Sequence, residues 1–137
     1  MPSEAFIHER KAAFGDTDAA GIVHFSRMLD YVEEAEHARF FQAGIPPFGS
    51  DSRWPRLRLE VDFLAPLRFG DEVQVELRLE RIGTSSLTFD FQIRLDRTIC
   101  ARGKWVVCHS RIGADGQMRA APIPAEHRAV FEGWLAA

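Results

Sequence analysis

The sequence predicts a small α+β domain in which one long helix packs against an antiparallel sheet. Two observations predict this fold class. Apolar side chains recur at helical spacing in the first third of the chain, and strict alternation of apolar and polar side chains follows them. The chain has 137 residues, the length of one domain, and no repeat or linker divides it, so residues 1–137 are expected to fold together.

The long helix is predicted for residues 25–43. Gly44 follows the last periodic position and Pro46 prevents continuation, which is how helices commonly end. The predicted apolar face consists of Phe25, Met28, Leu29, Val32, Ala35, Phe40 and Ala43.

Three segments with a two-residue period predict antiparallel strands that each bury one face. Weaker patterns predict a first strand, a fourth long strand and a short amphipathic helix at the end of the chain. A sheet with one long helix to cover it favours association with a second copy, so a homodimer or homotetramer is expected. In chain order the segments are residues 6–14, 57–63, 73–79, 87–95 and 99–112 for strands and 125–135 for the helix.

Composition excludes several function classes. The formal net charge is −3, from 17 basic and 20 acidic residues, which gives no electrostatic footprint for nucleic acid. No apolar run approaches the length needed for membrane insertion, and the N-terminus lacks the pattern of a signal peptide. Cys100 and Cys108 are too far apart on one strand to form a disulfide. Reduced thiols and a cytoplasmic location are therefore expected.

The loop before the long helix, residues 14–23, is where chemistry is most plausible. Backbone N–H groups at a helix start lack intrahelical partners, so they can stabilise a developing oxyanion. A carboxylate beside them, from Asp16 or Asp18, can attack a carbonyl or activate water. Asp is equally a favoured helix-capping residue, and from the residues alone capping is the commoner role.

Residues 14–23 (Phe-Gly-Asp-Thr-Asp-Ala-Ala-Gly-Ile-Val), together with residues 61–71 and 81–87, resemble the 4-hydroxybenzoyl-CoA thioesterase family of hotdog-fold proteins. They are also similar to the acyl-CoA thioesterases associated with the Tol-Pal system. The resemblance implies a hotdog fold, with one long helix wrapped by a five- to six-stranded antiparallel sheet. It further implies hydrolysis of an acyl- or aroyl-CoA thioester to free acid and CoA, without a metal or redox cofactor.

The same resemblance implies roles for individual residues. Asp18 matches the catalytic carboxylate, which acts as nucleophile or general base, and Phe25 supplies the backbone N–H that polarises the carbonyl. The other expected substrate-binding residues are Gly21, His24, Met28, Tyr31, Arg81 and Ser85. Glu36 has two open interpretations: an internal ion pair with Arg39, or a second active-site carboxylate like that on the helix of some hotdog thioesterases.

Three alternatives remain open at this level. One is a thioesterase specific for aryl- or naphthoyl-CoA in aromatic or quinone metabolism. Another is a hotdog hydratase that relies on a histidine such as His24. The third, from a different class, is a non-catalytic acyl-CoA or acyl-carrier binding module in which Asp18 is only a cap. The chain has no Gly-x-Ser-x-Gly elbow and no phosphate-binding loop, which argues against a serine hydrolase or a nucleotidase.

Overall fold

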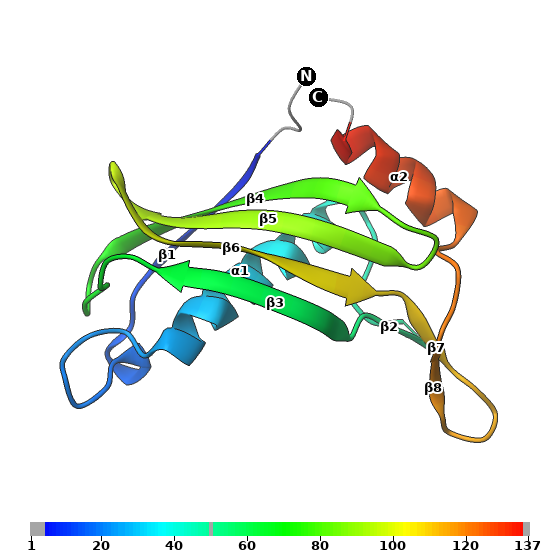
Figure 1. Cartoon of the computed structure of the whole chain (residues 1–137), viewed down its shortest axis with the longest axis horizontal. Coiled ribbons are helices and arrows are strands. Elements are labelled where there is room, and N and C mark those ends of the chain that lie inside the picture. The colour runs from blue at the N-terminus through cyan, green and yellow to red at the C-terminus, as the bar shows by residue number, and fades with distance from the viewer. Residues whose placement is uncertain (1–4, 50, 136–137) are drawn as a thin grey trace.

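A long helix lies against one face of a curved antiparallel sheet, as the sequence predicts for a hotdog-like α+β fold (Figure 1). This computed structural model describes residues 5–49 and 51–135. The main sheet has five strands in the order β1-β4-β5-β6-β3, and a smaller sheet has the order β2-β7-β8. The elements are β1 (Phe6–Lys11), the 3-10 turn η1 (Phe14–Asp16), α1 (Phe25–Gln42), β2 (Ser52–Arg53), β3 (Arg56–Phe63), β4 (Glu72–Ile82), β5 (Ser86–Leu95), β6 (Thr98–Cys108), β7 (Ser110–Ile112), β8 (Met118–Ala120) and α2 (Ala125–Leu135).

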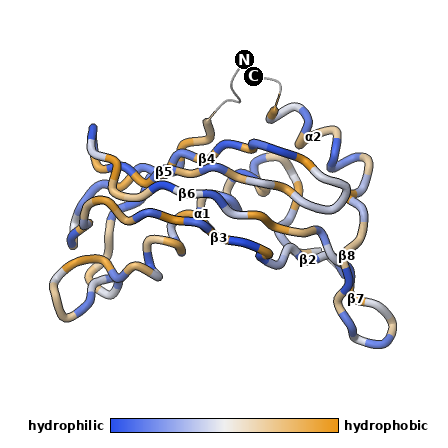
Figure 2. The backbone as a smooth tube through the Cα atoms, in the orientation of Figure 1, coloured by the Kyte–Doolittle hydropathy of each residue, from blue (hydrophilic) through white to orange (hydrophobic). Residues whose placement is uncertain are grey.

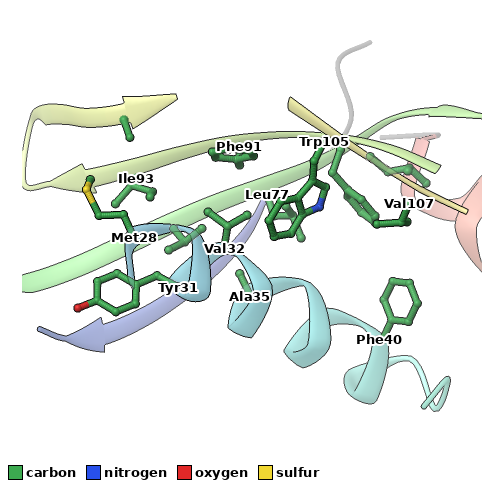
Figure 3. Packing of buried hydrophobic residues seen from close by; sticks show 14 of the residues in the cluster. Met28, Tyr31, Val32, Ala35, Phe40, Leu77, Phe91, Ile93, Trp105 and Val107 are labelled. Carbon is green, nitrogen blue, oxygen red and sulfur yellow. The ribbon is translucent and has the colours of Figure 1, made fainter. Parts of the chain in front are cut away.

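The core forms where the apolar face of α1 meets the apolar faces of the central strands (Figure 3). The alternation predicted for β4 and β5 is confirmed: four residues of each strand, two apart, are buried. Tyr31, Val32 and Ala35 of α1 are almost fully buried against them. The buried strand residues are Val73, Val75, Leu77, Leu79, Leu87, Phe89, Phe91 and Ile93.

A second packed region is aromatic and joins the end of α1 to α2. The Phe40 ring contacts Trp54 edge-to-face at 5.5 Å between centroids, and it also packs on Phe131 and Trp134 of α2. This cluster fixes the C-terminal helix beside the end of the sheet (Figure 1), at the position that the terminal amphipathic pattern predicts.

Two predicted strands end earlier than the pattern indicates. The first stops at Lys11, because the chain then turns into η1. The predicted strand over residues 99–112 is divided at His109 into β6, which belongs to the main sheet, and β7, which pairs with β2 and β8 in the smaller sheet. The short strands β2 and β8 were not predicted, since two or three residues are too few to show alternation.

The expectation that β3 buries one face is wrong. Leu57, Leu59 and Phe63 are 63%, 43% and 45% exposed. The strand lies at the edge of the sheet, paired with β6, while α1 packs mainly against β1, β4 and β5. Figure 2 shows the resulting alternation of hydrophobic and hydrophilic positions along this outer strand. Among the described residues, neither helix combines the length and apolar character that crossing a lipid bilayer requires.

Candidate active site

The loop before α1 is a tight hairpin that presents Asp18. Thr17 and Val23 form an antiparallel bridge, and the Asp18 N–H donates to the carbonyl of Ile22 at 2.9 Å. The Gly21 N–H donates back to the Asp18 carbonyl at 3.0 Å, which closes a four-residue turn. Gly21 has a φ of +79°, a left-handed conformation that side chains disfavour. The glycine thus makes this turn possible and holds Asp18 beside the helix start.

The start of α1 is capped by His24. Its Nδ1 accepts the N–H of Ser26 at 3.2 Å, and its carbonyl accepts the N–H groups of Arg27 and Met28. Within the part of the chain that the structure describes, these bonds leave the Phe25 N–H as the first-turn amide without an acceptor. A free amide at the positive end of a helix dipole is suited to bind a developing oxyanion.

Asp18 is not the helix cap, so the capping interpretation of this residue is wrong. Its Oδ1 accepts the N–H of Ala20 at 2.8 Å inside the loop, and the cap is supplied by His24. The Asp18 side chain is exposed and borders a cavity. Its carboxylate is therefore available to a ligand there.

Asp18 and the Phe25 residue border the same cavity, which has a volume of about 470 Å³. Apart from the one carboxylate, the lining is apolar. The rings of Phe25 and Phe63 meet edge-to-face at 6.0 Å between centroids, and both are about half exposed. The cavity is lined by Asp18, Ile22, Val23, Phe25, Met28, Phe63, Leu64, Ala65 and Pro66. The cavity is thus apolar, with one carboxylate at its border and in its lining the residue that carries the free helix-start amide.

The residues expected near the acyl group separate into three positions. Met28 lies in the cavity wall, as part of the buried face of α1. His24 and Gly21 flank the wall and shape the loop and the helix start. Tyr31 is 1% exposed, and its hydroxyl donates to Asp16 at 2.6 Å. The Tyr31 hydroxyl is therefore bonded to the loop that carries Asp16 and Asp18.

The two aspartates of the loop have different surroundings. Asp16 Oδ2 accepts hydrogen bonds from Tyr31, from Arg10 at 3.1 Å and from the Ala13 N–H at 3.1 Å. Burial alone raises the pKa of Asp16, but the bonds from Tyr31 and Ala13 and the charge of Arg10 outweigh it and hold the pKa below its ordinary value. Burial and the Asp16 bond raise the pKa of the Tyr31 hydroxyl, which therefore stays protonated as a donor. Asp16 is a bound structural anion, while Asp18 faces the cavity.

Arg81 and Ser85 lie at the other end of the sheet from this cavity. Arg81 borders a separate groove of about 500 Å³ on the solvent-facing side, together with Arg58 and Lys104. Along β6, Cys108 pairs with Ser86, the neighbour of Ser85, and Ala101 pairs with Phe63 of the cavity. These two positions of β6 are seven residues apart, or roughly 23 Å at about 3.3 Å per residue. Within one copy, neither residue is brought together with Asp18.

Glu36 is buried, 1% exposed, on the face of α1 that meets the sheet. Its Oε1 is 3.0 Å from a guanidinium nitrogen of Arg56 in β3, and its Oε2 accepts the indole N–H of Trp105 at 2.7 Å. The ion pair predicted with Arg39 is therefore wrong in its partner: Glu36 pairs with Arg56, which joins the helix to the sheet. Burial raises the pKa of Glu36 to about 7, although Arg56 and Trp105 both lower it. Glu36 is not among the residues that line the Asp18 cavity.

The second wall of the cavity, formed by residues 63–66, was not predicted from the sequence. These residues are the end of β3 and the three positions after it, and the Val23 N–H donates to the carbonyl of Leu67 at 2.8 Å. Pairing between two loops so far apart leaves no periodic pattern. The signal available was the apolar run from Phe63 to Leu67 directly after a strand.

Comparisons with known proteins agree with this fold. Residues 12–131 match the thioesterase-like superfamily. A 1,4-dihydroxy-2-naphthoyl-CoA hydrolase of Parasynechococcus marenigrum is 34% identical over 82% of this chain and 80% of its own length. A protein of Thermus thermophilus has a similar structure, with a TM-score of 0.85 and 27% identity over 96% of this chain and 99% of that one. The 1,4-dihydroxy-2-naphthoyl-CoA thioesterase of Synechocystis has a TM-score of 0.83 at 22% identity, covering 93% and 96% of the two chains, which supports the fold. With nearly its whole length matched, the chain belongs to the thioesterase-like superfamily.

Proposed function

We propose that this protein hydrolyses an acyl- or aroyl-CoA thioester, with Asp18 as the catalytic carboxylate and the Phe25 N–H as the oxyanion donor. The observation that carries the proposal is the single cavity that both residues border, at the free amide of a helix start. Membership of the thioesterase-like superfamily supports the reaction type.

The reaction breaks the bond between the carbonyl carbon and the sulfur of CoA. Asp18 either attacks that carbon itself, which forms a mixed anhydride that water then hydrolyses, or removes a proton from the water that attacks. In both routes negative charge develops on the carbonyl oxygen, where the Phe25 N–H stabilises it. Expulsion of the CoA thiolate and uptake of a proton give free acid and CoA.

The cavity favours an aromatic acyl group. Edge-to-face contact of Phe25 and Phe63 provides ring surfaces at the cavity wall, and aromatic groups gain from such packing. Relatives named as 1,4-dihydroxy-2-naphthoyl-CoA hydrolases support this substrate class. A naphthoyl-CoA or a hydroxybenzoyl-CoA, the latter by resemblance to the 4-hydroxybenzoyl-CoA thioesterase family, is thus proposed ahead of long aliphatic chains.

A panel of thioesters tests the proposal. Purified protein is mixed with naphthoyl-, benzoyl-, hexanoyl- and palmitoyl-CoA, and released CoA is measured with a thiol reagent. Turnover is expected, with the largest kcat/KM for the aromatic thioesters. A non-catalytic binding module instead binds these compounds, in a calorimetric titration, without releasing CoA. A preference for palmitoyl-CoA contradicts the aromatic assignment while leaving the hydrolase assignment in place.

We also propose that two copies pair through the free edge of β3. This edge is unpaired in the described structure and exposes Leu57, Leu59 and Phe63. Exposed, apolar edge strands favour pairing with another chain. In an antiparallel pair, the end of one sheet that carries Arg81 would lie nearer the Asp18 cavity of the other copy, where a cation suits the CoA phosphates. Packing of two such dimers would give the expected homotetramer.

A cytoplasmic location is proposed with this function. Cys100 and Cys108 are both buried free thiols, which fits a reducing compartment.

A further inference from the structure

We propose that Asp16 is a positioning residue, which holds the Asp18 loop and the start of α1 in register by binding Tyr31 and Arg10. The inference rests on the proposed function, because the groups that it places are the carboxylate of Asp18 and the N–H of Phe25. Tyr31, expected from the sequence beside the acyl group, then acts through Asp16.

The Asp16 side chain is fastened to two rigid elements. Tyr31 comes from the middle of α1 and donates at 2.6 Å, while Arg10 comes from β1 and donates at 3.1 Å. The Ala13 N–H adds a third bond to the same oxygen, Oδ2. Both charged side chains are largely shielded, with 14% of the Asp16 side chain and 22% of the Arg10 side chain exposed. Hydrogen bonds to a shielded carboxylate are among the stronger ones in proteins.

The Asp16 backbone is fastened to the helix start. Its carbonyl accepts the N–H of His24 at 2.8 Å, one residue before Phe25. Asp18 follows two residues later in the chain. One residue therefore connects the scaffold, through its side chain, to both ends of the segment that carries the catalytic groups.

The donors of Asp16 are themselves held in place. The Arg10 guanidinium lies 4.1 Å from the centre of the Tyr31 ring and forms an ion pair with Glu34, which His8 also contacts at 3.4 Å. Figure 3 shows the Tyr31 side chain projecting from α1, with its hydroxyl pointing away from the labelled core residues. Ring and guanidinium thus fix the direction of the two bonds to Asp16.

The loop has little other means of holding its position. Residues 18–21 are all exposed, so apolar packing contributes little to their order. The remaining ties are hydrogen bonds within the loop, including those from Thr17 to Phe14 and from Ala20 to Asp18, and the contact of the Phe14 and Phe69 rings. At the end of the loop, Val23 is buried and its N–H donates to the carbonyl of Leu67. A displacement of about 1 Å in a catalytic group can lower the rate about 100-fold, so small losses of order here carry a large kinetic effect.

Substitution of Asp16 by Asn tests the inference, since the amide keeps the shape but loses the charge. The Asp16→Asn variant is expected to show a kcat about 10- to 100-fold lower with KM within about threefold of wild type. Its kcat should keep the pH dependence of the wild type, because the titrating catalytic group is unchanged. Tyr31→Phe is expected to lower kcat less, and to add little in the Asp16→Asn background, because both changes break the same bond. Asp115→Asn, which removes an exposed carboxylate in the hairpin after β7, is the matched control and should leave kcat unchanged.

Hydrogen exchange measured without substrate provides a second readout. Amides of residues 14–24 are expected to exchange faster in Asp16→Asn than in wild type, and amides of β4 and β5 equally in both. If Asp16→Asn does not fold, the hydrogen-exchange and kinetic measurements are made on Tyr31→Phe, which removes one of the bonds to Asp16.

Three results overturn the inference: unchanged exchange with kcat within twofold of wild type, a raised KM with unchanged kcat, or loss of the pH dependence. The second would make Asp16 a substrate-binding group and the third a catalytic base. Absence of turnover by the wild-type protein contradicts the proposed function instead. The exchange data then decide whether Asp16 holds the loop.

Discussion

Among the described residues, Glu36 is the acidic residue that is least exposed to water. It lies between α1 and the sheet, bonded to Arg56 and to Trp105, and burial raises its pKa to about 7. Helical phase alone places this residue on the apolar face, and an internal ion pair was one of its two interpretations. The predicted partner, Arg39, is wrong: helical spacing favoured a residue three positions along α1, whereas Arg56 is twenty residues away and reaches Glu36 because β3 packs beside β6.

This pKa predicts a dependence of stability on pH. In the folded protein Glu36 keeps its proton up to about pH 7, whereas in the unfolded chain it loses it near its ordinary value of 4.5. The contribution of this group to the free energy of unfolding is therefore complete below about pH 4.5 and is lost as the pH rises through 7. Its upper limit is about 3 to 4 kcal/mol, at about 1.4 kcal/mol per pKa unit over the shift from 4.5 to about 7.

Melting temperatures of wild type and Glu36→Gln measure this effect between pH 5 and pH 8. The wild type should lose several degrees relative to the variant as the pH rises, since the amide does not titrate. Glu72→Gln, which removes an exposed carboxylate paired with Lys11 and absent from the groups that shift the Glu36 pKa, is the control and should follow the wild type. Parallel curves for wild type and Glu36→Gln would exclude a raised pKa.

His24 has a structural role at this scale besides the predicted place near the substrate. Its Nδ1 accepts the Ser26 N–H as the cap of α1. Histidine is not among the preferred N-cap residues, so the residue type alone does not predict this cap. The backbone geometry at the helix start is needed to recognise it.

The capping role predicts a graded effect of substitution on stability. His24→Ala should lose about 1 kcal/mol of unfolding free energy, while His24→Asn, which retains a capping acceptor, should lose less than half of that. Urea denaturation of both variants measures the difference. Equal losses would show that the imidazole stabilises the protein by something other than the cap.

At the scale of the elements, strong periodicity made the long helix and central strands predictable. The helix was predicted for residues 25–43 and spans Phe25–Gln42, and the alternation in β4 and β5 corresponds to their buried faces. β3 has the same alternation, yet its apolar side chains stay exposed because it forms the sheet edge. Sequence periodicity reports which residues share a face, and not whether anything covers that face.

The uncovered β3 edge predicts an association that one charge can weaken. Leu59→Lys places an ammonium group on the exposed, helix-side position of β3 and should shift the protein from dimer toward monomer in sedimentation velocity. Ile7→Lys is the matched control: Ile7 is 45% exposed, compared with 43% for Leu59, but lies on β1 at the opposite edge. The control should remain dimeric. Dissociation of both variants to the same extent would contradict pairing through β3.

At the scale of the whole molecule, the site depends on segments that only the fold brings together. The loop motif and the helix start were evident in the sequence, and the family resemblance singled out Asp18 and Phe25. The opposite cavity wall, residues 63–66, and the attachment of Asp16 to β1 and α1 depend on tertiary packing. Local pattern thus predicted the loop and the helix start, and the resemblance proposed Asp18 and Phe25, while the residues that place them required the structure.

The central claim is that the carboxylate of Asp18 acts directly in thioester hydrolysis, and the most direct measurement is the steady-state rate of CoA release by Asp18→Asn. The best substrate of the thioester panel is used, with Asp115→Asn as the control for a lost exposed carboxylate. With the fold checked by circular dichroism, Asp18→Asn should lose about 10³-fold or more in kcat, because the amide is neither nucleophile nor base. A folded Asp18→Asn protein with a kcat within tenfold of wild type would contradict this account.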